Sequence, residues 1–146
     1  MKTTLIALAL MATGVNAAAG ELSLQLHGPS WHAAPRAEFD STGRQWDELN
    51  VGLGIRSTYS ETWSVQAGFY RNSVDRTTVY AIVNYTPLQI GPVRMGVFGG
   101  LATGYPAGVP LGAGGMVQWG PVTLRIVPPI KKLTPLTLGV EVGIPF

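Results

Sequence analysis

The last ten residues of the chain, 137–146, alternate between two kinds of side chain. The apolar positions are Leu138, Val140, Val142, Ile144 and Phe146. The small or polar positions between them are Thr137, Gly139, Glu141 and Gly143. A period of two indicates a β-strand whose two faces meet different surroundings. An apolar face opposite a small or polar one favours the wall of a membrane barrel, with lipid outside and a polar lumen inside.

The first nineteen residues have the pattern of an export signal. Lys2 is followed by an apolar run over residues 5–11 and then by small residues. This pattern predicts a secretory signal peptide over residues 1–19, cleaved after Ala17 or Ala19. The apolar run is far shorter than the roughly 20 residues that a spanning helix needs. We therefore expect one mature domain over residues 20–146, in an exported protein.

The composition excludes two classes of protein. Without Lys2, nine basic residues face eight acidic ones, so the mature chain is nearly neutral and nothing favours nucleic-acid binding. The chain has no cysteine, which excludes a disulfide-stapled exported domain. Hydrophobic residues make up 46% of the chain and charged residues only 12%. That balance is typical of a barrel that exposes its apolar side chains to lipid.

Eight runs in the mature chain read as strands, each close to the ~9–11 residues of a tilted spanning strand. They are residues 22–32, 49–57, 63–73, 77–85, 93–101, 111–119, 121–127 and 136–146. The alternation seen in the last run recurs in several others, and glycine is frequent on the inner face. The sequence therefore predicts an all-β fold, an eight-stranded antiparallel transmembrane barrel of the bacterial outer-membrane type. Pro29 falls inside the first run, where a proline removes a ladder donor and predicts a bulge or a turn.

The connections alternate in length, which predicts the orientation of the barrel. Tight turns are expected near residues 58–62, 86–92 and 120–121, and longer loops at 33–48, 102–110 and 128–135. Outer-membrane barrels have short periplasmic turns and longer external loops. With an even number of strands, both termini then lie in the periplasm, and the first and third strands both end at the external side.

This topology brings His32 and Ser73 to one rim of the barrel. His32 ends the first run and Ser73 ends the third. An imidazole can accept a proton from a hydroxyl, which is the minimal requirement for acyl transfer. The alternative is that both are solvated polar residues at a water-facing edge.

Several segments give the chain a resemblance to the lipid A palmitoyltransferase family of outer-membrane enzymes. They are Ser30-Trp31-His32, Gly52-Leu53-Gly54, the stretch 69–73 and the stretch 117–124, followed by the terminal aromatic residue. The resemblance implies an eight-stranded barrel that holds one acyl chain in its upper half and moves a palmitoyl group from a phospholipid to lipid A. It also implies catalytic roles for His32 and Ser73. Asn72 stands where the family has aspartate, and an amide can orient a neighbour but carries no charge. Asp75 is either a substitute for that aspartate or a turn residue.

The positions of the arginines add to this reading. Arg36, Arg44, Arg71 and Arg76 fall on the predicted external side, with Lys131 and Lys132. Guanidinium groups match phosphate geometry, so these arginines are candidates for binding lipid phosphates, although polar loops commonly contain arginine. Three further arginines are expected to face inward in a polar plug: Arg56, Arg94 and Arg125, with Glu141, Gln66, Gln118, Tyr80 and Asn84. Four inner glycines are expected to leave room for an acyl chain: Gly68, Gly96, Gly112 and Gly114.

The predicted function is acyl transfer from a glycerophospholipid to lipid A, or a related deacylation, with His32 as base, Ser73 as hydroxyl partner and Asn72 orienting them. The predicted partners are these membrane lipids and the barrel-assembly machinery, for a monomer without cofactor. His27 and His32 are the only histidines and have no company of metal ligands. Two alternatives stay open: a non-catalytic barrel that binds lipid or stabilises the envelope, and a soluble periplasmic lipid carrier.

Overall fold

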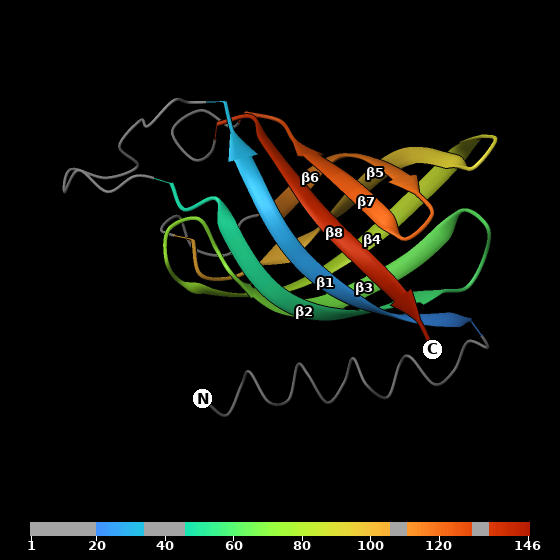
Figure 1. Cartoon of the computed structure of the whole chain (residues 1–146), viewed down its shortest axis with the longest axis horizontal. Helices are drawn as coiled ribbons and strands as arrows, with labels where there is room; N and C mark the ends of the chain where they lie inside the picture. Colours follow the sequence, from blue (N-terminus) through green and yellow to red (C-terminus); the bar gives the residue numbers. More distant parts are fainter. Residues whose placement is uncertain (1–19, 34–45, 106–110, 130–134) are drawn as a thin grey trace.

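The computed structural model describes residues 20–33, 46–105, 111–129 and 135–146. They form a closed antiparallel barrel of eight strands in chain order, as predicted (Figure 1). The strands are β1 (Glu21–His32), β2 (Leu49–Thr58), β3 (Trp63–Arg71), β4 (Thr77–Ile90), β5 (Val93–Ala102), β6 (Leu111–Trp119), β7 (Val122–Val127) and β8 (Thr137–Pro145). The predicted signal segment lies outside the described residues, as do Arg36, Arg44, Lys131 and Lys132.

The barrel closes where β8 pairs with β1, with Val142 opposite Leu26. The Phe146 N–H donates to the Leu22 carbonyl over 3.1 Å, so β1 begins where β8 ends. The short β2–β3, β4–β5 and β6–β7 connections lie at this same end, which we call the turn end. The opposite end, where β1 and β3 finish and β2 and β4 begin, is the loop end.

The side chains have the reverse of the usual soluble arrangement. The outer wall exposes large apolar residues, including Leu53, Ile55, Phe69 and Val97. The buried residues inside are mainly polar or charged, and the described ones are Gln25, Ser30, His32, Asn50, Arg56, Ser57, Gln66, Asn72, Ser73, Thr78, Asn84, Thr123, Arg125 and Glu141. This distribution follows from the period-two alternation and is typical of outer-membrane proteins.

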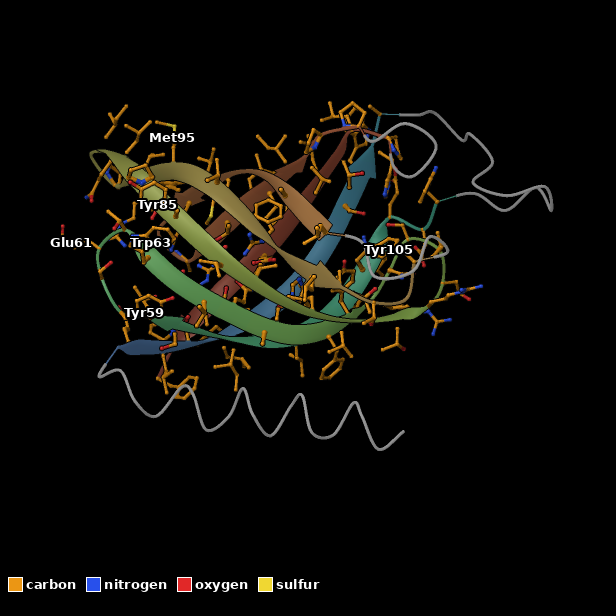
Figure 2. The ribbon with its side chains drawn as sticks, turned by 180° about the vertical axis from the view of Figure 1, so that it is seen from behind. Tyr59, Glu61, Trp63, Tyr85, Met95 and Tyr105 are labelled. Atoms are coloured by element: carbon orange, nitrogen blue, oxygen red, sulfur yellow. The ribbon has the colours of Figure 1, made fainter. Side chains whose placement is uncertain are left out.

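Exposed aromatic residues gather at the turn end (Figure 2). The rings of Trp63 and Tyr85 lie 4.4 Å apart, on adjacent strands, with Tyr59 close to them in the same region. Trp119 and Phe146 end their strands at the same side and are 66% and 74% exposed. Aromatic girdles of this kind mark the interface levels of membrane barrels. Among the described residues, no helix is long and apolar enough to cross a membrane.

Strand β4 is longer than predicted. It continues to Ile90, five residues beyond Tyr85, so the turn expected over residues 86–92 shrinks to Gly91 and Pro92. Pro87 suggested a break, but the register shifts between Tyr85 and Leu88 and pairing then resumes. Pro87 lies within this irregularity, where no ladder hydrogen bond is required from it. A proline could not donate one, because it has no N–H.

Two strand ends and one bulge are set by local chemistry. β1 changes register just after His27 against both neighbours, so the bulge predicted at Pro29 is confirmed. β3 ends at Arg71 rather than Ser73, because Asn72 begins a turn. Gly120, with φ of 55°, forms the β6–β7 turn with Pro121, so β7 begins at Val122.

The inner glycines do not all leave space. A Cβ at Gly68 would collide with the Leu53 carbonyl and would lie 2.8 Å from the Tyr80 hydroxyl. A Cβ at Gly96 or Gly114 would likewise overlap a neighbouring strand, whereas only open space adjoins Gly112. The expectation of room beside all four glycines is therefore wrong at three of them. There the missing side chain allows strands and an aromatic ring to approach closely.

Candidate active site

Three segments meet at the loop end of the barrel. The Ser30 N–H of β1 donates to the Glu48 carbonyl over 2.7 Å, just before β2. The Asp47 N–H donates to the Ser73 carbonyl over 2.9 Å, in the turn that follows β3. These backbone bonds hold the end of β1, the start of β2 and the β3–β4 turn together, so residues far apart in the sequence share one site.

Asn50 links the two serines of this site. Its Nδ2 donates to the Ser30 hydroxyl, and its Oδ1 accepts from the Ser73 hydroxyl over 3.3 Å. All three side chains are buried. Asn50 was not predicted as a site residue, because its link to the two serines depends on the pairing of β1 with β2.

His32 completes the group. Its side chain is only 6% exposed and stacks on Trp46, with ring centroids 5.2 Å apart and planes inclined by 15°. Within the described part of the chain, the buried Nδ1 of His32 has no hydrogen-bond partner. A buried polar atom without a partner is uncommon in proteins and often has a functional reason. We call Ser30, His32, Trp46, Asn50 and Ser73 the loop-end cluster.

The two residues predicted to share a rim are therefore in one buried cluster. His32 and Ser73 reach it from β1 and from the β3–β4 turn. In the described residues, side-chain hydrogen bonds join Ser73 to Asn50 and Asn50 to Ser30, and His32 stacks on Trp46. Ser30 and His32 lie two residues apart and are both buried, and no direct hydrogen bond between His32 and Ser73 is formed among the described residues. The Ser73 hydroxyl is held by its hydrogen bond to Asn50, while the Nδ1 of His32 has no hydrogen-bond partner among the described residues.

Asn72 contacts the turn and not the imidazole. Its Oδ1 accepts the N–H groups of Val74 and Arg76 over 3.1 and 2.9 Å. Its Nδ2 donates to Thr78 Oγ1 over 2.9 Å and to the Gly104 carbonyl over 3.2 Å. The fully buried amide thus uses both donors and both acceptor sites. These four hydrogen bonds hold the turn in which Ser73 lies.

Asp75 has the geometry of a turn residue. Its φ is 63°, a left-handed conformation that aspartate tolerates better than most residues. Its carboxylate accepts the Arg71 Nε–H over 2.7 Å, in an exposed ion pair. Arg76 is also exposed, beside them in the same turn. Of the four arginines proposed to bind phosphate, these two lie on the loop-end surface, and Arg36 and Arg44 are outside the described residues.

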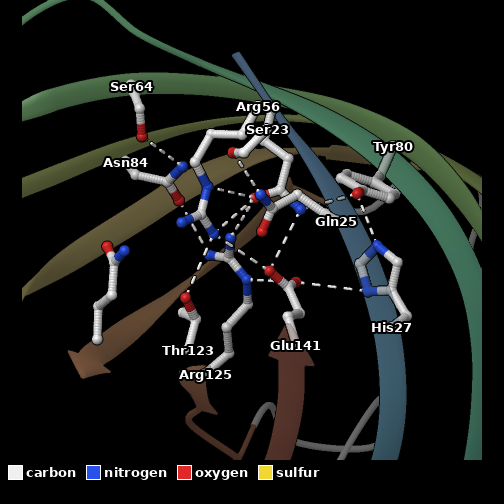
Figure 3. Close-up of polar contacts among 12 residues, drawn as sticks. Ser23, Gln25, His27, Arg56, Ser64, Tyr80, Asn84, Thr123, Arg125 and Glu141 are labelled. Carbon is white, nitrogen blue, oxygen red and sulfur yellow. Dashed lines mark hydrogen bonds and ion pairs between the residues drawn. The ribbon is translucent and has the colours of Figure 1, made fainter. Parts of the chain in front are cut away.

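The middle of the lumen is filled by a network of charged and polar groups (Figure 3). Glu141 accepts from Arg125 Nε over 2.7 Å and from Arg56 Nη2 over 3.4 Å, and its carboxylate lies 3.4 Å from His27 Nδ1. Arg125 also donates to Asn84 and Gln66 over 3.0 and 2.9 Å. We call this group the central cluster: His27, Arg56, Gln66, Tyr80, Asn84, Thr123, Arg125 and Glu141.

The central cluster matches the predicted polar plug with two exceptions, Arg94 and Gln118, and two additions, His27 and Thr123. Arg94 and Gln118 line a cavity at the turn end instead. His27, which sequence analysis did not use, joins the cluster: its Nε2 lies 2.6 Å from the Tyr80 hydroxyl. The sequence signal for His27 was its position two residues after Gln25, on the same face of β1.

Aromatic side chains occupy the lumen between the central cluster and the loop end. The hydroxyls of Tyr70 and Tyr105 lie 2.9 Å apart, and the Tyr70 ring lies 5.2 Å from His27 and 5.7 Å from Tyr80. Burial raises the pKa of Tyr105, which follows β5, so its hydroxyl stays protonated. The described residues thus fill the part of the lumen where an acyl chain was expected to bind.

Comparison with known proteins gives no further identification. No protein-family model matches the chain, and no curated protein matches it either. The resemblance to the palmitoyltransferase family therefore stays a prediction. Among the described residues, no group of three or more His, Asp or Glu side chains is placed to hold a metal ion.

Proposed function

We propose that the protein is a bacterial outer-membrane barrel whose loop-end cluster transfers an acyl chain from a glycerophospholipid to lipid A. The apolar outer wall and the aromatic residues of the turn end support a position in a membrane. The same outer wall, together with the polar lumen, disfavours the soluble lipid carrier. The observation that carries the catalytic proposal is the buried His32, whose Nδ1 lacks a partner among the described residues, in one cluster with a held serine hydroxyl.

The proposed orientation follows from the connections. The turn end faces the periplasm and the loop end faces the outside, where lipid A lies in the outer leaflet. Arg71 and Arg76 are exposed at the loop end, and guanidinium groups bind phosphate through two parallel N–H bonds. In this proposal they bind the lipid phosphates together with Arg36 and Arg44.

The proposed reaction uses His32 as general base. Its imidazole takes the proton of a lipid A hydroxyl while that oxygen attacks the ester carbonyl of the phospholipid. The ester C–O bond then breaks, and the proton passes from His32 to the departing glycerol oxygen, which leaves a lysophospholipid. Ser73 is the hydroxyl partner of His32. Asn72 positions Ser73 through the turn, and Asn50 positions it through a hydrogen bond. If water replaces the acceptor hydroxyl, the same step is a deacylation.

The test is mass analysis of lipid A from cells that express the wild type, His32→Ala or Ser73→Ala. We expect an added acyl chain in the wild type and a loss of about 10²–10⁴-fold in rate in either variant. Ser57→Ala is the control, since it removes a buried serine hydroxyl on β2 outside the cluster. A heat-dependent gel shift checks that each variant is folded. Unchanged transfer in both variants would exclude the assignment, and a chain removed from lipid A by the wild type would indicate a deacylase.

The second candidate function is a non-catalytic barrel that stabilises the envelope. Two observations favour it: polar and aromatic side chains occupy the middle of the described lumen and extend toward the loop end, and Asn72 has a complete structural role in its turn. This candidate predicts identical lipid A in cells with the wild type and both variants, with all three proteins folded in the outer membrane.

A further inference from the structure

A second site is suggested by a cavity of about 370 Å³ at the turn end, on the far side of the central cluster from His32. Arg56 of the central cluster is part of its wall. Much of the rest of the wall is polar, and includes Ser23, Gln25, Thr58, Ser64 and Gln118. The volume falls in the lower part of the range for small-molecule sites, roughly 300–1,000 Å³.

Two polar groups of this wall lack partners. Gln25 is fully buried; its Nε2 donates to Ser23 over 2.7 Å, but its Oε1 accepts no hydrogen bond in the described structure. Arg94 forms no ion pair or hydrogen bond with the residues described, although Arg56 and Arg125 are both paired. Gln25 Oε1 has almost no accessible surface and is therefore enclosed by the protein, whereas the half-buried Arg94 is open to a ligand in the cavity.

Arg94 and the hydroxyl groups of the wall define the chemistry of a ligand. Arg94 offers an N–H fork that fits the oxygens of a phosphate or carboxylate. The surrounding hydroxyls both donate and accept, as the hydroxyls of a polyol do. Two exposed acids of the same wall, Glu21 and Glu61, disfavour a ligand with anionic groups at both ends but accept hydrogen bonds from hydroxyls.

We propose that this cavity binds a short polyol with a single phosphate group. The phosphate binds Arg94, and the hydroxyls of the polyol bind the serine and threonine hydroxyls of the wall. The shared chemistry is that of glycerol phosphate, either as a free molecule or as the headgroup of phosphatidylglycerol. The inference does not depend on the catalysis proposed at the loop end.

The test is calorimetric titration of the full-length chain, folded in non-ionic detergent micelles. The probes are glycerol phosphate, inorganic phosphate, glycerol and a short-chain phosphatidylglycerol. We expect glycerol phosphate or the phosphatidylglycerol to bind, glycerol alone not to bind, and inorganic phosphate to bind more weakly. Arg94→Gln should weaken binding about 10- to 100-fold, the usual effect of losing a charge-assisted contact, and Arg94→Lys should weaken it less.

Gln89→Ala is the matched control, because Gln89 lies directly opposite Arg94 in the β4–β5 ladder but outside the cavity wall. It should leave the affinity unchanged. Binding of the phosphatidylglycerol alone, with dependence on Arg94, would identify the headgroup as the ligand. The proposal is overturned if neither phosphorylated probe binds, if inorganic phosphate binds as tightly as glycerol phosphate, or if Arg94→Gln has no effect in a folded barrel.

Discussion

The central cluster and the loop-end cluster are both buried and polar, but they differ in how their groups are satisfied. In the central cluster, the Glu141 carboxylate has two arginine partners and a histidine beside it, and Arg125 has three acceptors. In the loop-end cluster, Ser73 and Asn50 are bonded, but His32 Nδ1 has no partner among the described residues.

This difference indicates a division of labour within one lumen. A fully satisfied network is rigid, and removing any member leaves an unpaired charge. An unsatisfied nitrogen stabilises nothing, so its presence needs a different reason, such as contact with a substrate. We therefore expect substitutions in the central cluster to change stability most, and substitutions of His32 to change activity most.

The largest expected effect on stability is that of Glu141→Gln. The change removes the negative charge that lies against Arg125 and Arg56 in the buried lumen. Loss of one partner of a buried ion pair typically costs about 3–5 kcal/mol. Urea unfolding in detergent micelles, followed by tryptophan fluorescence, measures this. Glu61→Gln, at an exposed acid of the β2–β3 turn, should shift the unfolding free energy by less than about 0.5 kcal/mol. Equal effects of the two changes would contradict the comparison.

A smaller effect is expected for Asn72→Asp, the change that restores the residue type of the resembled family. An aspartate cannot donate to Thr78 Oγ1 or to the Gly104 carbonyl, and its charge would lie against that carbonyl oxygen. We expect a loss of about 1–3 kcal/mol in unfolding free energy.

The control for this change is Gln89→Glu, which converts an exposed amide to a carboxylate and should cost less than about 0.5 kcal/mol. If Asn72→Asp is as stable as the wild type, the turn does not need the amide, and its four hydrogen bonds do not explain why asparagine stands there.

Part of the fold could be predicted from the sequence, because the two faces of each strand differ in polarity. The alternation of Asn50, Gly52, Gly54 and Arg56 with apolar residues determined the inner face of β2, and the barrel places these side chains as expected. The end of β4 could not be predicted in this way. A proline looks the same in a sequence whether it stops a strand or lies at a register shift, and only the pairing of Leu88 with Met95 distinguishes the two.

The candidate site was predictable only in outline. Chain direction alone places the ends of the first and third strands at one rim, so His32 and Ser73 were found. Asn50 and Trp46 were missed, because their contacts depend on the β1 bulge and on the register of β1 against β2. The inner glycines were misread for a related reason. Whether a missing side chain leaves space or admits a neighbouring backbone depends on how strongly the strands coil, which no single strand reveals.

The smallest predicted effect concerns the turn between β3 and β4, which carries Ser73 of the loop-end cluster. Asp75 combines an exposed ion pair to Arg71 with a left-handed backbone. Asp75→Gly and Asp75→Ala both remove the ion pair, which is worth at most about 1 kcal/mol at the surface. Alanine has a Cβ, which makes the left-handed conformation unfavourable, whereas glycine has no Cβ and adopts this conformation without that cost. We expect Asp75→Ala to be less stable than Asp75→Gly by about 1 kcal/mol in urea unfolding. Equal stabilities would mean that the ion pair, and not the backbone, selects the residue in the turn that presents Ser73.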